Sequence, residues 1–211
     1  MNAPMRVTHT VISLVAGVSS LGLAVPASPA RAQCTPQWFP GGGLLGVNRR
    51  VIALTTWDPV GTGPAGEHLV IGGEFEVAGD VKANNIATWS GSHWHALGSG
   101  LNSYVYAVTV YNGELIAGGS FFTAGDMPCN RIARWDGTEW HALGDGIGEG
   151  IVYALAVYNG DLIAAGEFTT AGGVPCNRIA RWDGTQWQPL GGGIGDERVS
   201  VLAVHDGALI A

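Results

Sequence analysis

The stretch that decides the fold is VYALAVYNGDLIAAGEF, from Val152 to Phe168. Two apolar runs flank the dipeptide Asn159-Gly160. Because Asn and Gly both tolerate positive φ, this dipeptide predicts a two-residue hairpin turn between two antiparallel strands. The run before the turn is apolar throughout, which predicts a strand buried on both faces.

The same stretch recurs along the chain at a spacing of 47 residues. Residues 105–119 are VYAVTVYNGELIAGG and residues 199–211 are VSVLAVHDGALIA. A more diverged copy begins at Val51 and contains an inserted loop before Leu69. Self-similarity at a fixed period indicates a repeat architecture.

A second motif follows each hairpin, after a Gly-rich loop. It is NIATWSGSHWHAL at 85–97, RIARWDGTEWHAL at 131–143 and RIARWDGTQWQPL at 178–190. Asp183-Gly184 predicts a turn between a third strand and a fourth. The fourth strand is the most polar and contains Pro189, which indicates the edge of a sheet because proline donates no ladder hydrogen bond.

Four antiparallel strands in about 47 residues are typical of a propeller blade. We therefore expect an all-β propeller of four-stranded antiparallel blades, incomplete in this chain, with three full blades and partial ones. The expected segments are a signal peptide (1–32) and a repeat domain (33–211). That domain would hold blades at about 51–98, 104–144 and 151–191, a partial blade at 198–211 and a possible closing strand at 36–43.

A pair of tryptophans flanks the turn between the third and fourth strands of every unit: Trp89/Trp94, Trp135/Trp140 and Trp182/Trp187. Residues present in every repeat commonly serve what all repeats share, which is stacking on their neighbours. We therefore expect these side chains to pack between blades. A sugar-stacking platform is the functional alternative.

The glycine doublets and the later tryptophans resemble the kelch type of β-propeller. The motifs are LIAGGSF at 115–121, RWDGTEW at 134–140 and the doublets Gly72-Gly73 and Gly118-Gly119. The units also resemble those of uncharacterised secreted bacterial repeat proteins and the propeller part of fungal cortical polarity-marker proteins. The third doublet departs from the pattern, because Ala165 precedes Gly166. The resemblance implies an architecture and says little about activity.

The amino terminus predicts export. Arg6 precedes an apolar stretch from Val11 to Val25, and Ala30-Arg31-Ala32 has the form of a signal-peptidase site. We expect a periplasmic, cell-surface or extracellular protein with no membrane span in the mature chain. The net charge of −7 and the absence of a basic stripe argue against nucleic acid as a partner.

Cysteines and histidines are the first candidates for chemistry. Cys129 and Cys176 occupy the same place in adjacent units, so we expect two unbridged thiols rather than a disulfide, and Cys34 makes the count odd. His93 and His95 share one face of a strand. A metal would need a third ligand. His141 matches His95, but Gln188 replaces it in the next unit, which favours polar residues on an exposed edge.

Charged residues give weaker signals. Glu74 and Glu167 are equivalent, but Ser120 replaces them in the middle unit, and Asp80 and Asp126 lie in Ala-Gly-Asp loops typical of turns. The third strands carry recurring arginines, which we expect to pair with acids such as Asp136 and Asp183 rather than to bind an anion: Arg131, Arg134, Arg178 and Arg181. We assign no catalytic, cofactor-binding or metal-binding residues and expect no cofactor.

The function expected from these features is an exported, non-enzymatic binding or surface scaffold for an unknown protein or glycan. The alternative is a secreted enzyme, such as a kelch-like oxidase or a glycan-active propeller. An enzyme would need non-repeated polar residues converging on one face, and the strongest non-repeated feature is the loop from Trp57 to Glu67. A third reading is a fragment without independent activity. Architecture alone does not decide among these possibilities.

Overall fold

The computed structural model describes residues 46–211 except 62, 64–65 and 196. The predicted signal peptide (1–32), the predicted closing strand (36–43) and Cys34 lie outside the described residues. Within the described part, no helix has the length and apolar character that crossing a membrane requires.

The described residues form three four-stranded antiparallel sheets in repeats. The first sheet holds β1 (Arg50–Trp57), β2 (His68–Glu74), β5 (Ile86–Trp89) and β6 (Trp94–Ala96). The second holds β7 (Val105–Tyr111), β8 (Glu114–Gly119), β11 (Ile132–Trp135) and β12 (Trp140–Ala142). The third holds β13 (Gly150–Tyr158), β14 (Asp161–Phe168), β17 (Ile179–Trp182) and β18 (Trp187–Pro189). A hairpin of β19 (Ala203–His205) and β20 (Ala208–Ile210) follows.

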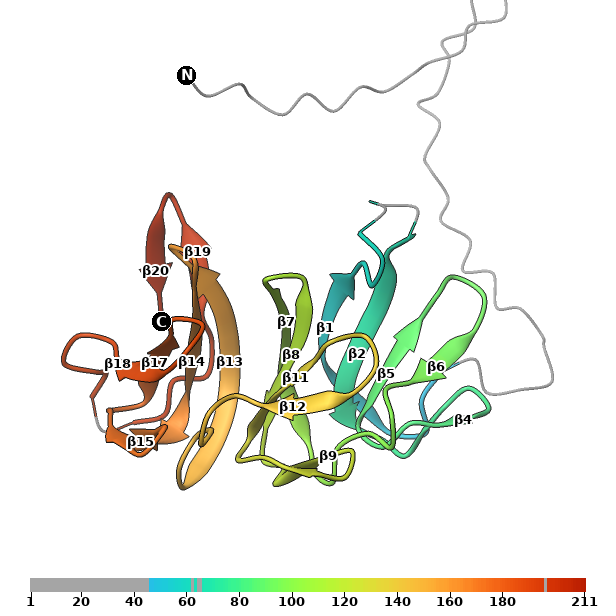
Figure 1. Cartoon of the computed structure of the whole chain (residues 1–211), viewed down its shortest axis with the longest axis horizontal. Coiled ribbons are helices and arrows are strands. Elements are labelled where there is room, and N and C mark those ends of the chain that lie inside the picture. The colour runs from blue at the N-terminus through green and yellow to red at the C-terminus, as the bar shows by residue number, and fades with distance from the viewer. Residues whose placement is uncertain (1–45, 62, 64–65, 196) are drawn as a thin grey trace, which may run out of the picture. The chain divides into compact units, whose positions relative to one another are not determined.

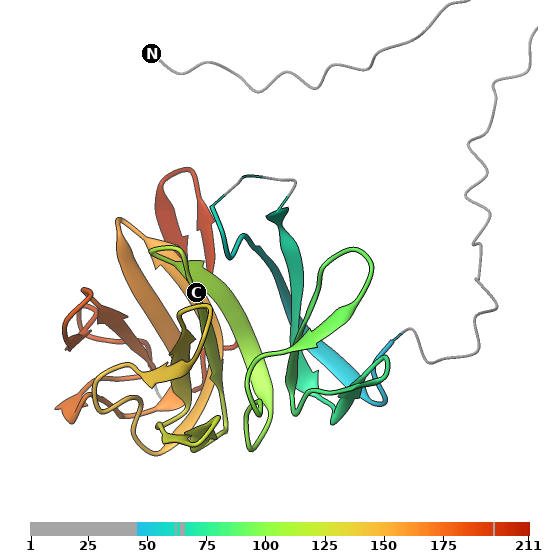
Figure 2. The same cartoon turned by 45° about the vertical axis from the view of Figure 1, so that its right-hand side comes forward.

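The sheets stand side by side in chain order, with the inner strands β1, β7 and β13 packed against one another (Figures 1 and 2). In every sheet the strands run in chain order from this inner strand to the edge strand, β6, β12 or β18. The prediction of an all-β propeller with four-stranded antiparallel blades is therefore confirmed. We call these sheets blades 1, 2 and 3.

The prediction that the first strand of each blade is the fully buried one is wrong. Val157 in β13 is 40% exposed and Leu54 in β1 is 67% exposed. The second strand is the buried one, since Leu162 and Ala164 in β14 are fully enclosed. The reason is the strand order: the first strand has a hydrogen-bonded neighbour on one side only, whereas the second has a strand on each side.

The Gly-rich loop between the second and third strands contains a two-stranded ribbon that the sequence did not predict. The ribbons are β3 (Val77–Ala78) with β4 (Val81–Lys82), β9 (Thr123–Ala124) with β10 (Met127–Pro128), and β15 (Thr170–Ala171) with β16 (Val174–Pro175). The chain that leads into each blade touches the ribbon of that blade through a single bridge: Val47 to Ala78, Leu101 to Ala124 and Ile147 to Ala171. Two-residue strands give too short an alternation pattern to be recognised.

The tryptophan pairs of blades 2 and 3 join neighbouring blades, as predicted. The two rings of each pair lie 5.2–5.4 Å apart. The Nε1 of Trp140 in blade 2 donates a hydrogen bond to the carbonyl oxygen of Leu97 at the end of blade 1 (2.8 Å). Trp187 makes the same bond to Leu143 (2.9 Å). Since both indoles are buried, they are not available as a sugar-stacking surface.

Candidate functional site

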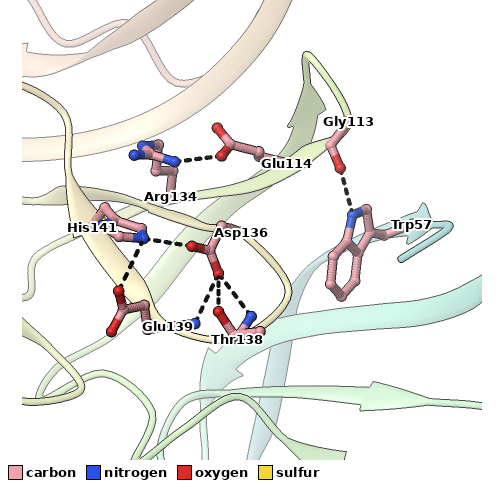
Figure 3. Close-up of polar contacts among 8 residues, drawn as sticks. All are labelled: Trp57, Gly113, Glu114, Arg134, Asp136, Thr138, Glu139 and His141. Atoms are coloured by element: carbon pink, nitrogen blue, oxygen red, sulfur yellow. Dashed lines mark hydrogen bonds and ion pairs between the residues drawn. The ribbon is translucent and has the colours of Figure 1, made fainter. Parts of the chain in front are cut away.

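Asp136, Glu139 and His141 come together around the turn between β11 and β12 (Figure 3). The Nε2 of His141 lies 2.6 Å from the Oδ2 of Asp136 and 3.8 Å from the Oε1 of Glu139. The Oδ1 of Asp136 also accepts hydrogen bonds from the backbone N–H groups of Thr138 and Glu139. The bond from the Glu139 N–H, followed by that from His141, holds the pKa of Asp136 well below its usual value.

The contact between the turn and the fourth strand recurs in the other blades, with different side chains. In blade 3, the Nε2 of Gln188 donates to the Oδ2 of Asp183 (2.8 Å). In blade 1, the Nε2 of His95 lies 3.1 Å from the Oγ of Ser90. Because a neutral amide takes the place of His141, the contact serves the turn and does not require a metal.

His93 and His95 do not form the metal site considered from the sequence. His93 bonds to the neighbouring Ser92, and the ring of His95 stacks on that of His68 at 5.9 Å. Across the described residues, neither histidine belongs to a group of three potential ligands close to one another.

The arginines of the third strands pair with acids other than the ones expected. Arg134 bonds to Glu114 (Figure 3), and the Nη1 of Arg181 lies 2.7 Å from the Oδ2 of Asp161. Both acids lie on the adjacent second strand. The expected partner Asp183 is bonded instead to the N–H groups of its own turn, as Asp136 is.

The other two recurring arginines bond to backbone carbonyl groups. Arg131 donates to the carbonyl oxygens of Ile147 and Gly150, and Arg178 donates to that of Phe168. The four recurring arginines therefore all have structural contacts.

The remaining candidates take structural positions. Cys129 and Cys176 are buried and unbridged, and burial raises the pKa of both thiols, that of Cys129 to about 11. Asp80 and Asp126 are exposed, in the turns of the β3–β4 and β9–β10 ribbons. Glu74 forms an ion pair with Arg50 at 2.6 Å.

The inserted loop after β1 also has structural contacts. The Nε1 of Trp57 donates to the carbonyl oxygen of Gly113 in the first hairpin turn of blade 2 (2.9 Å; Figure 3). The carboxylate of Asp58 accepts bonds from the N–H groups of Val60, Gly61 and Gly63. The two most distinctive side chains of this loop thus hold the loop and join two blades.

A cavity lies at the opposite end of these blades, where the ribbons are. Its volume is about 500 Å³, within the range of small-ligand sites. It opens between blade 1 and the segment that leads into blade 2. Its lining is mostly polar: Glu76, Lys82, Asn84, Asn85, Ser99, Gly100, Leu101, Asn102, Thr123 and Gly125.

Two charged residues of this cavity break the repeat. Lys82 ends β4, where the other two ribbons end in Pro128 and Pro175. It is the only lysine in the sequence. Glu76 lies one residue beyond a buried phenylalanine, where the other blades have Phe122 and Thr169.

Asn85 also departs from the repeat, because Arg131 and Arg178 take its place in blades 2 and 3. All three adopt positive φ, between 63° and 66°, so the backbone is the same. The Nδ2 of Asn85 reaches the carbonyl oxygen of Leu101 (2.8 Å). Arg131 reaches the equivalent carbonyl of Ile147 and also that of Gly150. The shorter side chain of Asn85 thus leaves open the space that a guanidinium group fills between blades 2 and 3.

Hydrogen bonds hold the other amides of the cavity wall. The Nδ2 of Asn84 donates to the carbonyl oxygen of Ser99 (2.7 Å). The Oδ1 of Asn102 accepts from the N–H groups of Phe122 (2.8 Å) and Thr123 (3.0 Å). Side chains fixed in this way lose little conformational freedom when a ligand binds, so the wall is preorganised.

A polar network leads from the cavity to the inner strands. Arg49 lies 3.8 Å from Glu76 and 3.5 Å from Glu74. The pKa of Glu74 lies below its usual value. The hydrogen bond from Arg50 is the main cause, and a hydrogen bond from the Tyr104 hydroxyl group lowers the pKa further.

Tyr104 begins a row of aromatic rings at the inner strands. Its ring lies 6.3 Å from that of Tyr106, which lies 5.2 Å from that of Tyr153 in blade 3. The guanidinium group of Arg198 lies 5.5 Å over the Tyr153 ring. Tyr104 is 37% exposed, so the row offers accessible aromatic surface beside the network.

The sequence interpretation did not select the cavity residues, although a signal was present. Aligning the units shows a single lysine where the others have proline, and an asparagine where the others have arginine. Recurring residues such as Asn84 share the cavity wall with three that differ from their counterparts in the other blades, namely Glu76, Lys82 and Asn85.

Comparison with known families agrees with the fold. A family model described as a domain of unknown function (DUF5122) beta-propeller matches residues 159–182, which extend from the hairpin turn of blade 3 to the end of β17. The comparison with curated proteins found no match.

Proposed function

We propose that this protein is an exported, non-enzymatic propeller that binds part of a glycan or protein in the cavity between blades 1 and 2. The observation that carries the proposal is that repeat-breaking polar residues gather at one cavity, namely Glu76, Lys82 and Asn85. The polar groups that recur are engaged in turns and blade contacts. Polar residues that differ from their counterparts at the equivalent positions of the other blades are those expected to serve a ligand.

The lining of the cavity supports binding rather than catalysis. Asn84, Asn85 and Asn102 are neutral amides held by backbone groups, which suits recognition of hydroxyl and amide groups. Covalent catalysis uses a nucleophile paired with a base, and we assign no such pair in this cavity. Export is supported by the pattern of the first 32 residues, and sequencing the secreted protein from its amino terminus should give Gln33.

The test is a binding screen of the exported protein on immobilised glycans and on surface proteins of the producing cell. The informative variant is Asn85→Arg, which restores the residue of the other blades and fills the cavity. We expect this variant to fold, because Arg131 and Arg178 adopt the same backbone conformation, and to lose binding at least tenfold.

The matched control is His141→Gln. It also replaces a residue by its counterpart in the next blade, but away from the cavity. We expect it to bind as the unmodified protein does. Equal binding by Asn85→Arg, or the absence of any bound glycan or protein, would overturn the proposal. Chemical turnover of a bound glycan would favour the enzyme alternative.

A further inference from the structure

The charge of Lys82 is the feature of the cavity that identifies a ligand class. Among the described residues, no carboxylate lies within ion-pair distance of its ammonium group. Glu76 is the acid of the cavity lining, and its carboxylate lies 3.8 Å from Arg49. The cavity therefore presents a cation that no acid in the described part of the chain pairs with, on a protein whose net charge is −7.

Because the protein carries a net negative charge, Lys82 does not serve a general attraction of anions. The electrostatic field of a negatively charged protein would repel an anionic ligand at long range. Recognition must then depend on a short contact, in which the ammonium group donates hydrogen bonds to an oxyanion. A single carboxylate matches a single lysine.

The amides beside Lys82 match a ligand rich in hydroxyl groups. Asn84 and Asn85 use their Nδ2 atoms in bonds to the backbone, which leaves their Oδ1 atoms as acceptors. Asn102 uses its Oδ1 atom, which leaves its Nδ2 as a donor. Since a hydroxyl group both donates and accepts, a sugar ring can satisfy acceptors and donors placed side by side.

The lining favours a glycan over an acidic peptide. Leu101, the one large apolar residue of the lining, is 1% exposed, so the wall offers no apolar pocket for a peptide side chain. Apolar or aromatic anchors dominate the binding of proteins and peptides. Tyr104, two residues after Asn102 on the same segment, offers an aromatic face for a neighbouring sugar.

We infer that the cavity takes an acidic sugar unit of a glycan, whose carboxylate pairs with Lys82 and whose hydroxyl groups bond to Asn84, Asn85 and Asn102. This inference rests on the proposed binding function and specifies its ligand class. The next sugar along the chain lies toward Tyr104.

The presence of one lysine allows a direct test on the full exported protein. Reductive methylation with ¹³C-formaldehyde keeps the charge of Lys82 and gives it a single side-chain NMR signal, apart from that of the amino terminus. The probes are a trimer of galacturonic acid and its methyl ester, which is the same trimer without charge. We expect the acid, and not the ester, to shift the Lys82 signal.

Substitutions provide the second readout. Lys82→Pro restores the residue of the other ribbons and should lower affinity for the trimer about tenfold or more, as the loss of a charged hydrogen bond does. Lys82→Arg should retain most of the affinity. A shift by the ester equal to that by the acid, or unchanged affinity in Lys82→Pro, would overturn the inference.

Two further outcomes separate this inference from the proposed function. If neutral glycans bind and Asn85→Arg abolishes that binding, the binding function holds and the acidic class is wrong. If a poly-glutamate peptide binds more tightly than the trimer, the ligand is an acidic peptide and the glycan class is wrong. If the screen finds no ligand, both proposals fail.

Discussion

The indole Nε1 of Trp140 donates a hydrogen bond to the carbonyl oxygen of Leu97, 2.8 Å away in the preceding blade. Trp187 repeats the contact with Leu143. Each tryptophan thus pairs within its own sheet and satisfies a carbonyl group of the sheet before it. Contacts between blades are therefore as specific as those within them.

Trp140→Phe should destabilise the protein. It removes one of two hydrogen bonds to the Leu97 carbonyl oxygen, which also accepts from the Gly100 N–H (3.1 Å); this loss costs about 0.5–1.5 kcal/mol, and the variant also loses ring area. Urea unfolding at pH 7 measures the loss. Trp89→Phe is the control, because it makes the same chemical change at a half-buried ring whose nitrogen makes no bond among the described residues. Equal losses in the two variants would contradict the role of the bond.

Arg131→Asn should copy the arrangement of blade 1 into blade 2. Asparagine can keep a bond to the carbonyl oxygen of Ile147, as Asn85 does with Leu101, but not the 2.6 Å bond of Arg131 to Gly150. We expect a loss of about 1 kcal/mol in the free energy of unfolding. Chemical denaturation measures it, and a crystal structure of the variant should show a second cavity. A closed junction in that structure would contradict our account of how the cavity forms.

Acid should weaken the fold partly through Asp183. Hydrogen bonds from the Gln186 N–H, the Thr185 hydroxyl and the Thr185 N–H lower the pKa of Asp183 to about 2. An unfolded aspartate has a pKa of about 3.9. Since the folded pKa is the lower one, the stabilisation is present above about pH 4 and is lost as the pH falls toward 2.

Asp183→Asn should therefore reduce the dependence of stability on pH between about 4 and 2, relative to the unmodified protein. Urea midpoints at several pH values in this window measure the slope. Asp126→Asn, in an exposed ribbon turn, is the matched control and should leave the slope unchanged. An unaltered slope in Asp183→Asn would show that its hydrogen bonds do not set the acid response.

His141→Gln should keep the stability of the unmodified protein to within about 0.5 kcal/mol, because Gln188 makes the same contact in blade 3. Zinc should not raise the melting temperature of either protein. A zinc-dependent rise that disappears in His141→Gln would instead identify Asp136, Glu139 and His141 as a metal site. Differential scanning fluorimetry with and without zinc distinguishes the two results.

The architecture was predictable because each blade repeats the same local signals. Asn112, Asn159 and Asp206 adopt positive φ at the predicted hairpin turns, and Pro189 lies on an edge strand. The ribbons were not predictable because their strands are two residues long. The burial of the inner strand was misjudged, because apolar composition does not distinguish the middle of a sheet from its edge.

The candidate site was less accessible to sequence analysis. Conspicuous residues such as His141 and Asp58 proved to brace turns and loops. The cavity depends on the length of one side chain, Asn85, and on the neighbouring segment that passes it. The differences at Lys82 and Asn85 are visible in the aligned repeats, but the space that these residues line has no sequence pattern and required the structure.

The bond between Trp140 and Leu97 also has an evolutionary consequence. Excising residues 98–143 would remove one unit and bring Trp187 to Leu97, the same donor type to the same acceptor type. Gene duplication or deletion in steps of one unit therefore keeps the same tryptophan-to-leucine hydrogen bond between each pair of neighbouring blades. Such a chain can change its number of blades by recombination without redesigning the contacts between them, whereas this deletion would remove residues 99–102, 123 and 125 from the lining of the Lys82 cavity.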